Sequence, residues 1–175
     1  MKSLKILGCD PGIGGAVALI SAGGGRNFPR IEILDLPIVD TGFGHRIHFR
    51  RFREILQDWK PDVAYLEEVW PRPVGTPGGG MGFVSAGRFM KTAGALQALV
   101  YCEVEERHIH MVTPHQWKKF FKLGPSKDQA RALAVDLFLE AAPLLRLKKN
   151  HNRAEACLIA AYGACRYGML DLQLL

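Results

Sequence analysis

The sequence lacks the patterns that mark several common classes of protein. Its four cysteines show no C-x-x-C spacing and lie in apolar stretches, so we expect reduced, buried thiols with neither a zinc site nor a disulfide. No run reaches the roughly 18 consecutive apolar residues of a membrane-spanning helix, and the short segment before the first predicted strand does not resemble a signal peptide. We therefore expect a cytoplasmic protein with no membrane partner.

Motifs for nucleotide binding and signs of modular organisation are missing as well. Residues 78–80 are three glycines, but the Lys-Ser/Thr pair of a phosphate-binding P-loop does not follow them. A nucleotide cofactor is therefore not expected, and chain flexibility is the simpler explanation of these glycines. There are no repeats or evident linkers, and the length suits one hydrophobic core, so residues 1–175 are expected to form a single domain.

What the sequence does contain is an excess of positive charge on a largely apolar chain. It has 23 Lys and Arg against 17 Asp and Glu, a net charge of +6, and 48% hydrophobic residues. This balance favours a polyanionic partner, such as nucleic acid or an anionic membrane surface. Charge alone does not decide the matter, because many basic proteins bind nothing acidic.

Hydrophobic periodicity predicts alternating strands and helices. Glycine turns at 12–15 and 23–25 separate the first strands, and Thr113-Pro114 is a typical cap and first residue of a helix. The order predicts an α/β fold in which helices cover a sheet. The predicted strands cover residues 4–9, 16–20, 31–36, 62–66 and 108–112, and the predicted helices cover 46–59, 85–104, a segment starting at 114, 126–141 and 152–167.

Three acidic residues stand where elements of such a fold converge. Asp10 follows one predicted buried strand and Glu67 follows another, so both project from the same sheet end if those strands are neighbours. Glu155 lies in the first turn of the last predicted helix, and its apolar neighbours indicate that its side chain points toward the protein interior. Hard divalent cations bind clusters of carboxylate oxygens. Asp10, Glu67 and Glu155 are therefore candidate metal ligands.

Each of these carboxylates also has a simpler explanation when it is taken alone. Asp10 could only shape the D-P-G turn, Glu67 could be a surface charge at a strand end, and Glu155 could be an ordinary acidic residue at a helix N-terminus. Spacing along the chain does not by itself establish that the three converge.

Several ordered sequence blocks resemble the RuvC-type Holliday junction resolvases. The match covers nearly the whole chain, and four ordered blocks at compatible separations are far more specific than D-P-G alone. The blocks are I-L-G-C-D-P-G-I-G-G-A-V-A-L-I, A-Y-L-E-E-V-W, V-T-P-H-Q-W-K-K-F-F with S-K-D-Q-A, and H-N-R-A-E-A-C-L-I-A.

This resemblance implies an RNase H-like fold, a five-stranded mixed sheet flanked by helices. It further implies a homodimer that resolves four-way DNA junctions in recombination and repair, by phosphodiester hydrolysis with two divalent metals. Two metals about 4 Å apart activate a water and stabilise the leaving oxygen. Mg²⁺ is the expected cofactor because the ligands are all oxygens, and Mn²⁺ should substitute for it.

The third family ligand falls three residues before Glu155, at Asn152, where this sequence departs from the pattern. Asparagine is neutral and a weaker ligand, although its carbonyl oxygen can coordinate a hard cation. His151 lies four residues before Glu155 and could replace the missing ligand or transfer a proton, or it could simply contact phosphate or solvent. We therefore include Asn152 and His151 among the candidate catalytic residues.

Candidate DNA contacts are one aromatic residue and a group of lysines. The resemblance places Trp70 at the crossover, where its ring would stack on bases, although a tryptophan packed under its own loop is an open alternative. It also implies phosphate contacts from a basic patch beside the active site, formed by Lys118, Lys119, Lys122 and Lys127.

Two other functions stay open at this point. A different RNase H-like nuclease, acting on branched DNA or RNA, would share the acidic cluster but not Trp70 or the T-P-H-Q-W-K block. A junction-binding protein with impaired catalysis would explain Asn152. An actin-like ATPase, by contrast, needs two such domains, for which 175 residues are too few.

Overall fold

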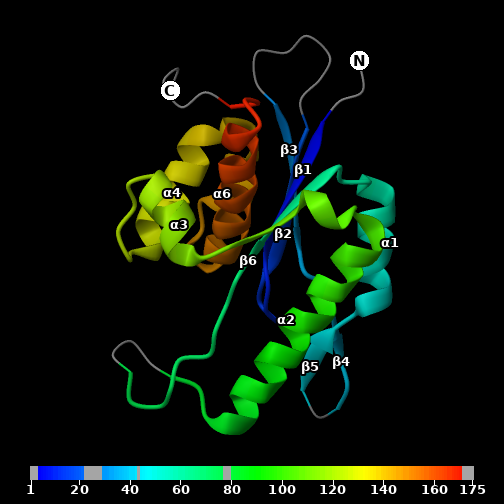
Figure 1. The fold of residues 1–175 in the computed structure, drawn as a ribbon. Coiled ribbons are helices and arrows are strands. Elements are labelled where there is room, and N and C mark those ends of the chain that lie inside the picture. The colour runs from blue at the N-terminus through cyan, green and yellow to red at the C-terminus, as the bar shows by residue number, and fades with distance from the viewer. Residues whose placement is uncertain (1–3, 22–28, 43, 77–79, 171–175) are drawn as a thin grey trace.

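A five-stranded mixed sheet forms the centre of the molecule in the computed structural model, which describes residues 4–21, 29–42, 44–76 and 80–170 (Figure 1). The strand order is β3-β2-β1-β6-β7, with β1–β2 and β2–β3 antiparallel and β1–β6 and β6–β7 parallel. The predicted five-stranded mixed sheet is confirmed. Its strands are β1 (Lys5–Asp10), β2 (Ala16–Ser21), β3 (Arg30–Asp35), β6 (Val63–Glu67) and β7 (Ile109–Val112).

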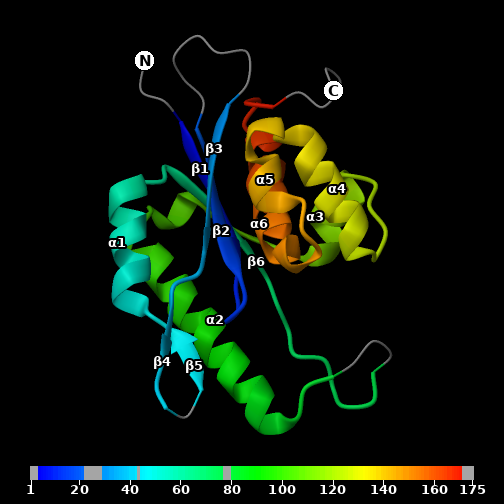
Figure 2. The ribbon, with the colours of Figure 1, turned by 180° about the vertical axis from the view of Figure 1, so that it is seen from behind.

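Helices cover both faces of this sheet (Figures 1 and 2). Strand residues alternate between two hydrophobic cores, so that Ile6 packs toward one group of helices and Leu7 toward the other. One face carries α1 (Phe49–Trp59) and α2 (Phe83–Glu103); the other carries α3 (Pro114–Phe120), α4 (Lys127–Leu137), α5 (Ala142–Leu145) and α6 (His151–Arg166). Short 3-10 turns cover Glu106–His108, Leu139–Ala141 and Lys148–Asn150.

Helix α6 lies in direct backbone contact with β1. A Cβ atom at Gly8 would lie 2.4 Å from both the Ala156 carbonyl oxygen and the Ala160 backbone nitrogen, so only glycine fits there. Small residues on the facing side of α6, including Ala156 and Ala160, are fully buried and permit this approach. The close contact brings the N-terminal turns of α6, with Glu155, beside the end of β1.

A small hairpin precedes α1, and the sequence did not predict it. It pairs β4 (Ile38–Asp40) with β5 (His45–Ile47), and Arg46 lies in it although the periodicity placed it in a helix. The helix begins only at Phe49, because the His48 ring accepts the Arg51 backbone N–H at 3.1 Å and caps it. The predicted beginning of this helix was therefore wrong.

The region after α4 differs from the prediction as well. The helix expected to run to residue 141 ends at Leu137, and a 3-10 turn and α5 follow, so the expected connector at 145–151 is partly helical. Cys102 is exposed, contrary to expectation, whereas Cys9 and Cys157 are buried as expected. The predicted turn at 23–25 and the glycines at 78 and 79 lie outside the described residues.

Helix α2 is packed along only part of its length. Of its 21 residues, Leu96 and Val100 are the buried ones, both in its second half. Near its start, Phe83 is 95% exposed and Val84 is 65% exposed.

Across the part of the chain that is described, no helix is both long and apolar enough to span a membrane.

Candidate active site

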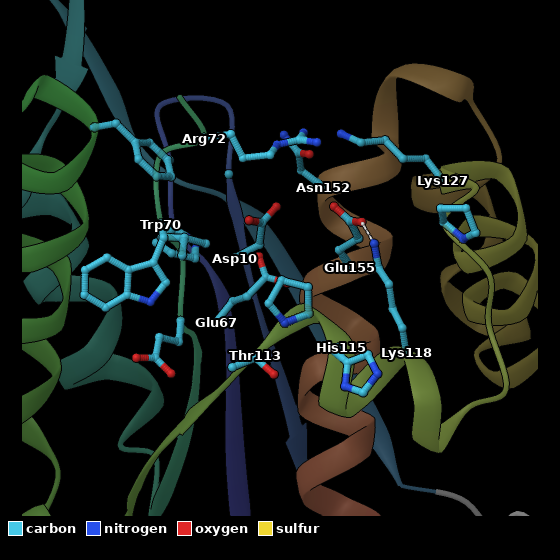
Figure 3. Close-up of a pocket in the computed structure, with 18 of the residues that line it drawn as sticks. Asp10, Glu67, Trp70, Arg72, Thr113, His115, Lys118, Lys127, Asn152 and Glu155 are labelled. Carbon is cyan, nitrogen blue, oxygen red and sulfur yellow. Dashed lines mark ion pairs between the residues drawn. The ribbon is translucent and has the colours of Figure 1, made fainter. Parts of the chain in front are cut away.

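Three carboxylates meet at one end of the sheet (Figure 3). Asp10 is the last residue of β1 and Glu67 the last residue of β6, and these parallel neighbours end at the same edge. Glu155 reaches the same place from the second turn of α6, and all three line one open cleft. Glu67 and Glu155 are each only 8% exposed. The structure thus brings together the three residues that the sequence singled out.

The surroundings of Asp10 and Glu67 disfavour the charged forms of these two carboxylates. Burial raises the pKa of Asp10 well above its ordinary value, and the negative charges of Glu67 and Glu155 raise it further. Burial also raises the pKa of Glu67, while the hydrogen bond from Trp117 acts in the opposite direction. Lys118 and Lys127 offset part of the effect at both carboxylates. The cluster is therefore one that a bound cation would stabilise.

The raised pKa of Asp10 predicts how the stability of the metal-free protein depends on pH. The folded state holds the Asp10 proton more tightly than the unfolded state, so stability falls as pH rises from about 4, the ordinary pKa, toward the raised folded value. Asp10→Asn removes this loss. We expect it to raise the Tm at neutral pH by about 2–6 °C, and to change it little near pH 4. Thermal melts in EDTA across this range measure it, and a gain that did not depend on pH would contradict it.

Two of the carboxylates have defined partners on α3. The indole Nε1 of Trp117 donates a 2.9 Å hydrogen bond to Glu67 Oε1, and Lys118 Nζ lies 3.3 Å from Glu155 Oε1. Helix α3 is itself fixed by a capping box between Thr113 and Gln116. The capping role predicted for Thr113 is confirmed, whereas sequence reasoning did not find the Trp117 contact.

The donor set suits a hard divalent cation, because it offers carboxylate oxygens whose mutual repulsion such an ion would relieve. Asp10, Glu67 and Glu155 are the residues that would hold it. Among the described residues, no three histidine, cysteine or acidic side chains already form a group around one common point.

Of the two residues predicted to complete the metal site, Asn152 lines the cleft and His151 does not. The Asn152 side chain lines the cleft, and its Nδ2 donates a hydrogen bond to the Gly14 carbonyl in the turn between β1 and β2. This bond uses the amide nitrogen and leaves only the Asn152 oxygen for a cation. His151 is not among the described residues that line the cleft, and its Nδ1 lies 3.1 Å from the Lys148 carbonyl oxygen. The structure does not bring His151 to the carboxylates.

A basic rim surrounds the carboxylates. Trp70 is 70% exposed and lies on the opposite side of the carboxylates from Lys118 and Lys127 (Figure 3). Arg72 and His115 also line the cleft, although sequence reasoning did not single them out. Their position next to Trp70 and in the T-P-H-Q-W-K block was the available signal. The rim lysines, all of which line the cleft, are Lys118, Lys119, Lys122 and Lys127.

Lys122 occupies a backbone conformation that favours glycine. Its φ is 55°, and it follows the end of α3. Its N–H bonds the Lys119 carbonyl at 3.1 Å, and the next residue, Leu123, bonds the Lys118 carbonyl at 2.8 Å. This pair of bonds is the Schellman motif, in which glycine is the usual residue at the left-handed position. A lysine held there is aimed into the cleft at a cost in stability.

Lys122→Gly should therefore stabilise the fold and weaken binding to nucleic acid. We expect a gain of about 0.5–1 kcal/mol in the free energy of unfolding, because glycine adopts a positive φ without steric penalty. We also expect the salt dependence of DNA binding to fall by about one phosphate contact. Denaturant melts and binding at several salt concentrations measure the two effects.

Lys60→Gly is the matched control, because Lys60 has φ 50° at the end of α1 and does not line the cleft. It should give the same stabilisation with unchanged DNA binding. If both variants bound DNA as the wild type does, Lys122 would have no role in binding.

Comparisons with known proteins agree with this geometry. No family model matches the sequence. A 54-residue segment is 50% identical to the chloroplastic Holliday junction resolvase MOC1 of Chlamydomonas reinhardtii, a match that covers 29% of this chain and only 6% of that protein. Two structures of RuvC from Thermus thermophilus superpose on the chain, one with a TM-score of 0.55 and the other, a complex with Holliday junction substrate, with a TM-score of 0.57. Each is 18% identical in sequence to this chain, and each alignment covers 95% of this chain and 98% of the RuvC chain. The chain is thus similar in sequence to a Holliday junction resolvase and has the RNase H-like fold of RuvC.

Proposed function

We propose that this protein is a divalent-metal-dependent endonuclease that cuts four-way DNA junctions. The observation that carries the proposal is the convergence of Asp10, Glu67 and Glu155 at the floor of a cleft with a lysine-rich rim. Support comes from the names of its relatives, a Holliday junction resolvase and a RuvC solved with junction substrate.

In this proposal the carboxylates and the lysines have separate tasks. Asp10, Glu67 and Glu155 hold the metal, which supplies activation of a water and stabilisation of the leaving oxygen when it is bound. Mg²⁺ fits an all-oxygen donor set, and Mn²⁺ should substitute for it. The rim lysines bind phosphates and hold the scissile strand over the carboxylates. Lys118 connects the two groups, since its Nζ lies 3.3 Å from Glu155 Oε1.

Trp70 and Arg72 are proposed to contact the DNA near the branch point. The Trp70 ring is exposed and borders the cleft, which fits stacking on an unpaired base better than packing under its own loop. Arg72 also lines the cleft and brings a further positive charge to it.

A homodimer fits both the substrate and the exposed surface of α2. A four-way junction needs two matched cuts, and a twofold dimer presents two identical sites. The first half of α2 exposes Phe83 and Val84 at 95% and 65%, and a second copy of the chain is the occupant we propose for this surface.

A second candidate function follows from Asn152. Because residue 152 is a neutral asparagine whose amide nitrogen donates to the Gly14 carbonyl, the site has three carboxylates where the resemblance implies four ligands. A protein with such a site could bind junctions and cut them poorly. The two functions differ in turnover, not in substrate.

Cleavage of a synthetic four-way junction by the purified protein tests the proposal. The reactions contain Mg²⁺ or Mn²⁺, with linear duplex and an RNA/DNA hybrid of the same sequence as controls. Paired nicks on the junction alone support the resolvase. Binding without cutting in either metal favours the second candidate, and cleavage of the hybrid would move the chain to another branch of RNase H-like nucleases.

A further inference from the structure

The hydrogen bond between Trp117 and Glu67 joins a core residue to the active site. Trp117 is fully buried, in the same core as Val112 and Leu158. Its Nε1 lies 2.9 Å from Glu67 Oε1, and Glu67 is itself 8% exposed. We propose that Trp117 is a positioning residue, which fixes one oxygen of Glu67 so that the other is presented to the metal; this rests on the function proposed above.

The turn of α3 that carries Trp117 is held by a capping box at the start of the helix. Thr113 Oγ1 accepts the Gln116 backbone N–H, and Gln116 Oε1 accepts the Thr113 backbone N–H at 2.7 Å. Pro114 occupies the first turn with a fixed φ. Since the ring is also enclosed in the core, the indole N–H has one available direction. A donor held in this way selects a single orientation for the Glu67 carboxylate.

The chemistry of an indole suits this task better than that of a charged partner. The indole N–H is a neutral group that only donates, so it occupies one carboxylate oxygen and leaves the full negative charge on Glu67. Lys118 acts differently on Glu155, because its ammonium is a cation and competes with a metal for that carboxylate. Trp117 therefore orients a ligand without competing for it. Hydrogen-bonding partners of metal ligands typically account for about 10–100-fold in metal affinity.

The test compares Trp117→Phe with wild type in direct Mn²⁺ binding, measured by calorimetry without DNA. We expect about a tenfold loss of Mn²⁺ affinity. Junction affinity measured in EDTA should change less than about twofold, because no rim lysine is substituted and phenylalanine keeps an aromatic ring beside Lys118, whose Nζ lies 5.0 Å from the centre of the Trp117 ring. Trp59→Phe is the matched control, since Trp59 lies on α1 and lines no part of the cleft; its Mn²⁺ affinity should equal that of wild type.

Loss of packing is separated from loss of the N–H by a second variant. At position 117 an isosteric analogue, with sulfur in place of the indole N–H, keeps the ring and removes only the donor. An equal loss of Mn²⁺ affinity with this analogue supports the proposal. Unchanged Mn²⁺ affinity in the analogue would overturn it, even if Trp117→Phe were unstable. Mn²⁺ binding is measured without cleavage, so this test does not depend on nuclease activity. A wild-type protein that binds Mn²⁺ but does not cut DNA would contradict the proposed nuclease function alone.

Discussion

Asp10→Asn and Glu67→Gln should each reduce junction cleavage by at least about 10³-fold, which corresponds to roughly 4 kcal/mol of transition-state stabilisation. Both residues sit at the ends of paired strands and line the same cleft. Either amide keeps the shape of the side chain but removes the negative charge that a hard cation requires. Single-turnover cleavage in Mg²⁺ measures the loss.

Binding should respond in the opposite direction. Each substitution removes a negative charge from a cleft that we propose to receive phosphates, so junction affinity measured in EDTA should be retained or improved. Glu32→Gln is the control, because Glu32 is a partly exposed residue of β3 that does not line the cleft. It should cut as wild type does. If the Asp10 or Glu67 variants lost binding together with cleavage, the division of roles between carboxylates and lysines would be wrong.

Gly8→Ala should produce the largest loss of stability of any single methyl group added to the sheet. The new Cβ would stand 2.4 Å from two backbone atoms of α6, at Ala156 and Ala160. Backbone cannot rotate aside as a side chain can, so α6 would have to move away from β1. We expect a loss of about 3 kcal/mol or more in the free energy of unfolding, and a fall in Tm on the order of 10 °C. Thermal and denaturant melts measure it.

Gly94→Ala is the matched control for this prediction. Gly94 lies inside α2, is exposed, and would place its Cβ in open space. It should raise stability by about 1 kcal/mol, because alanine favours the helix over glycine. A Gly8 variant that melted within a degree or two of wild type would show that α6 does not approach β1 as closely as described.

How far the sequence predicts this fold depends on how regular each element is. The strand at 4–9 and the helix at 85–104 were placed within two residues, because long apolar patterns identify elements well. The hairpin β4–β5 was missed, since each strand has three residues and Ile47 is its one buried residue. Arg46 and its neighbours resemble the polar face of the helix that follows. A period of two cannot be recognised in three residues.

The sequence likewise predicts some features of the candidate site and not others. Asp10 and Glu67 were found because they directly follow buried strands, and pairing of β1 with β6 then places them together. The Trp117 contact could not be predicted, because it joins residues 50 positions apart through the orientation of a side chain. The position of His151 depends on the 3-10 turn that starts α6, which the sequence pattern did not indicate.

Helix α2 carries an energetic consequence of its own. Its second half is anchored through Leu96 and Val100, whereas the half that begins at Phe83 contains no fully buried side chain, and Phe89 and Met90 are only partly buried. Half of this 21-residue helix is too short to be more than marginally stable in water by itself, and the glycines at 87 and 94 weaken α2 further. We therefore expect the first turns of α2 to unfold locally at a small cost in free energy. A partner that covers Phe83 and Val84 would favour the folded form of these turns, so the free energy of folding them would form part of its binding free energy.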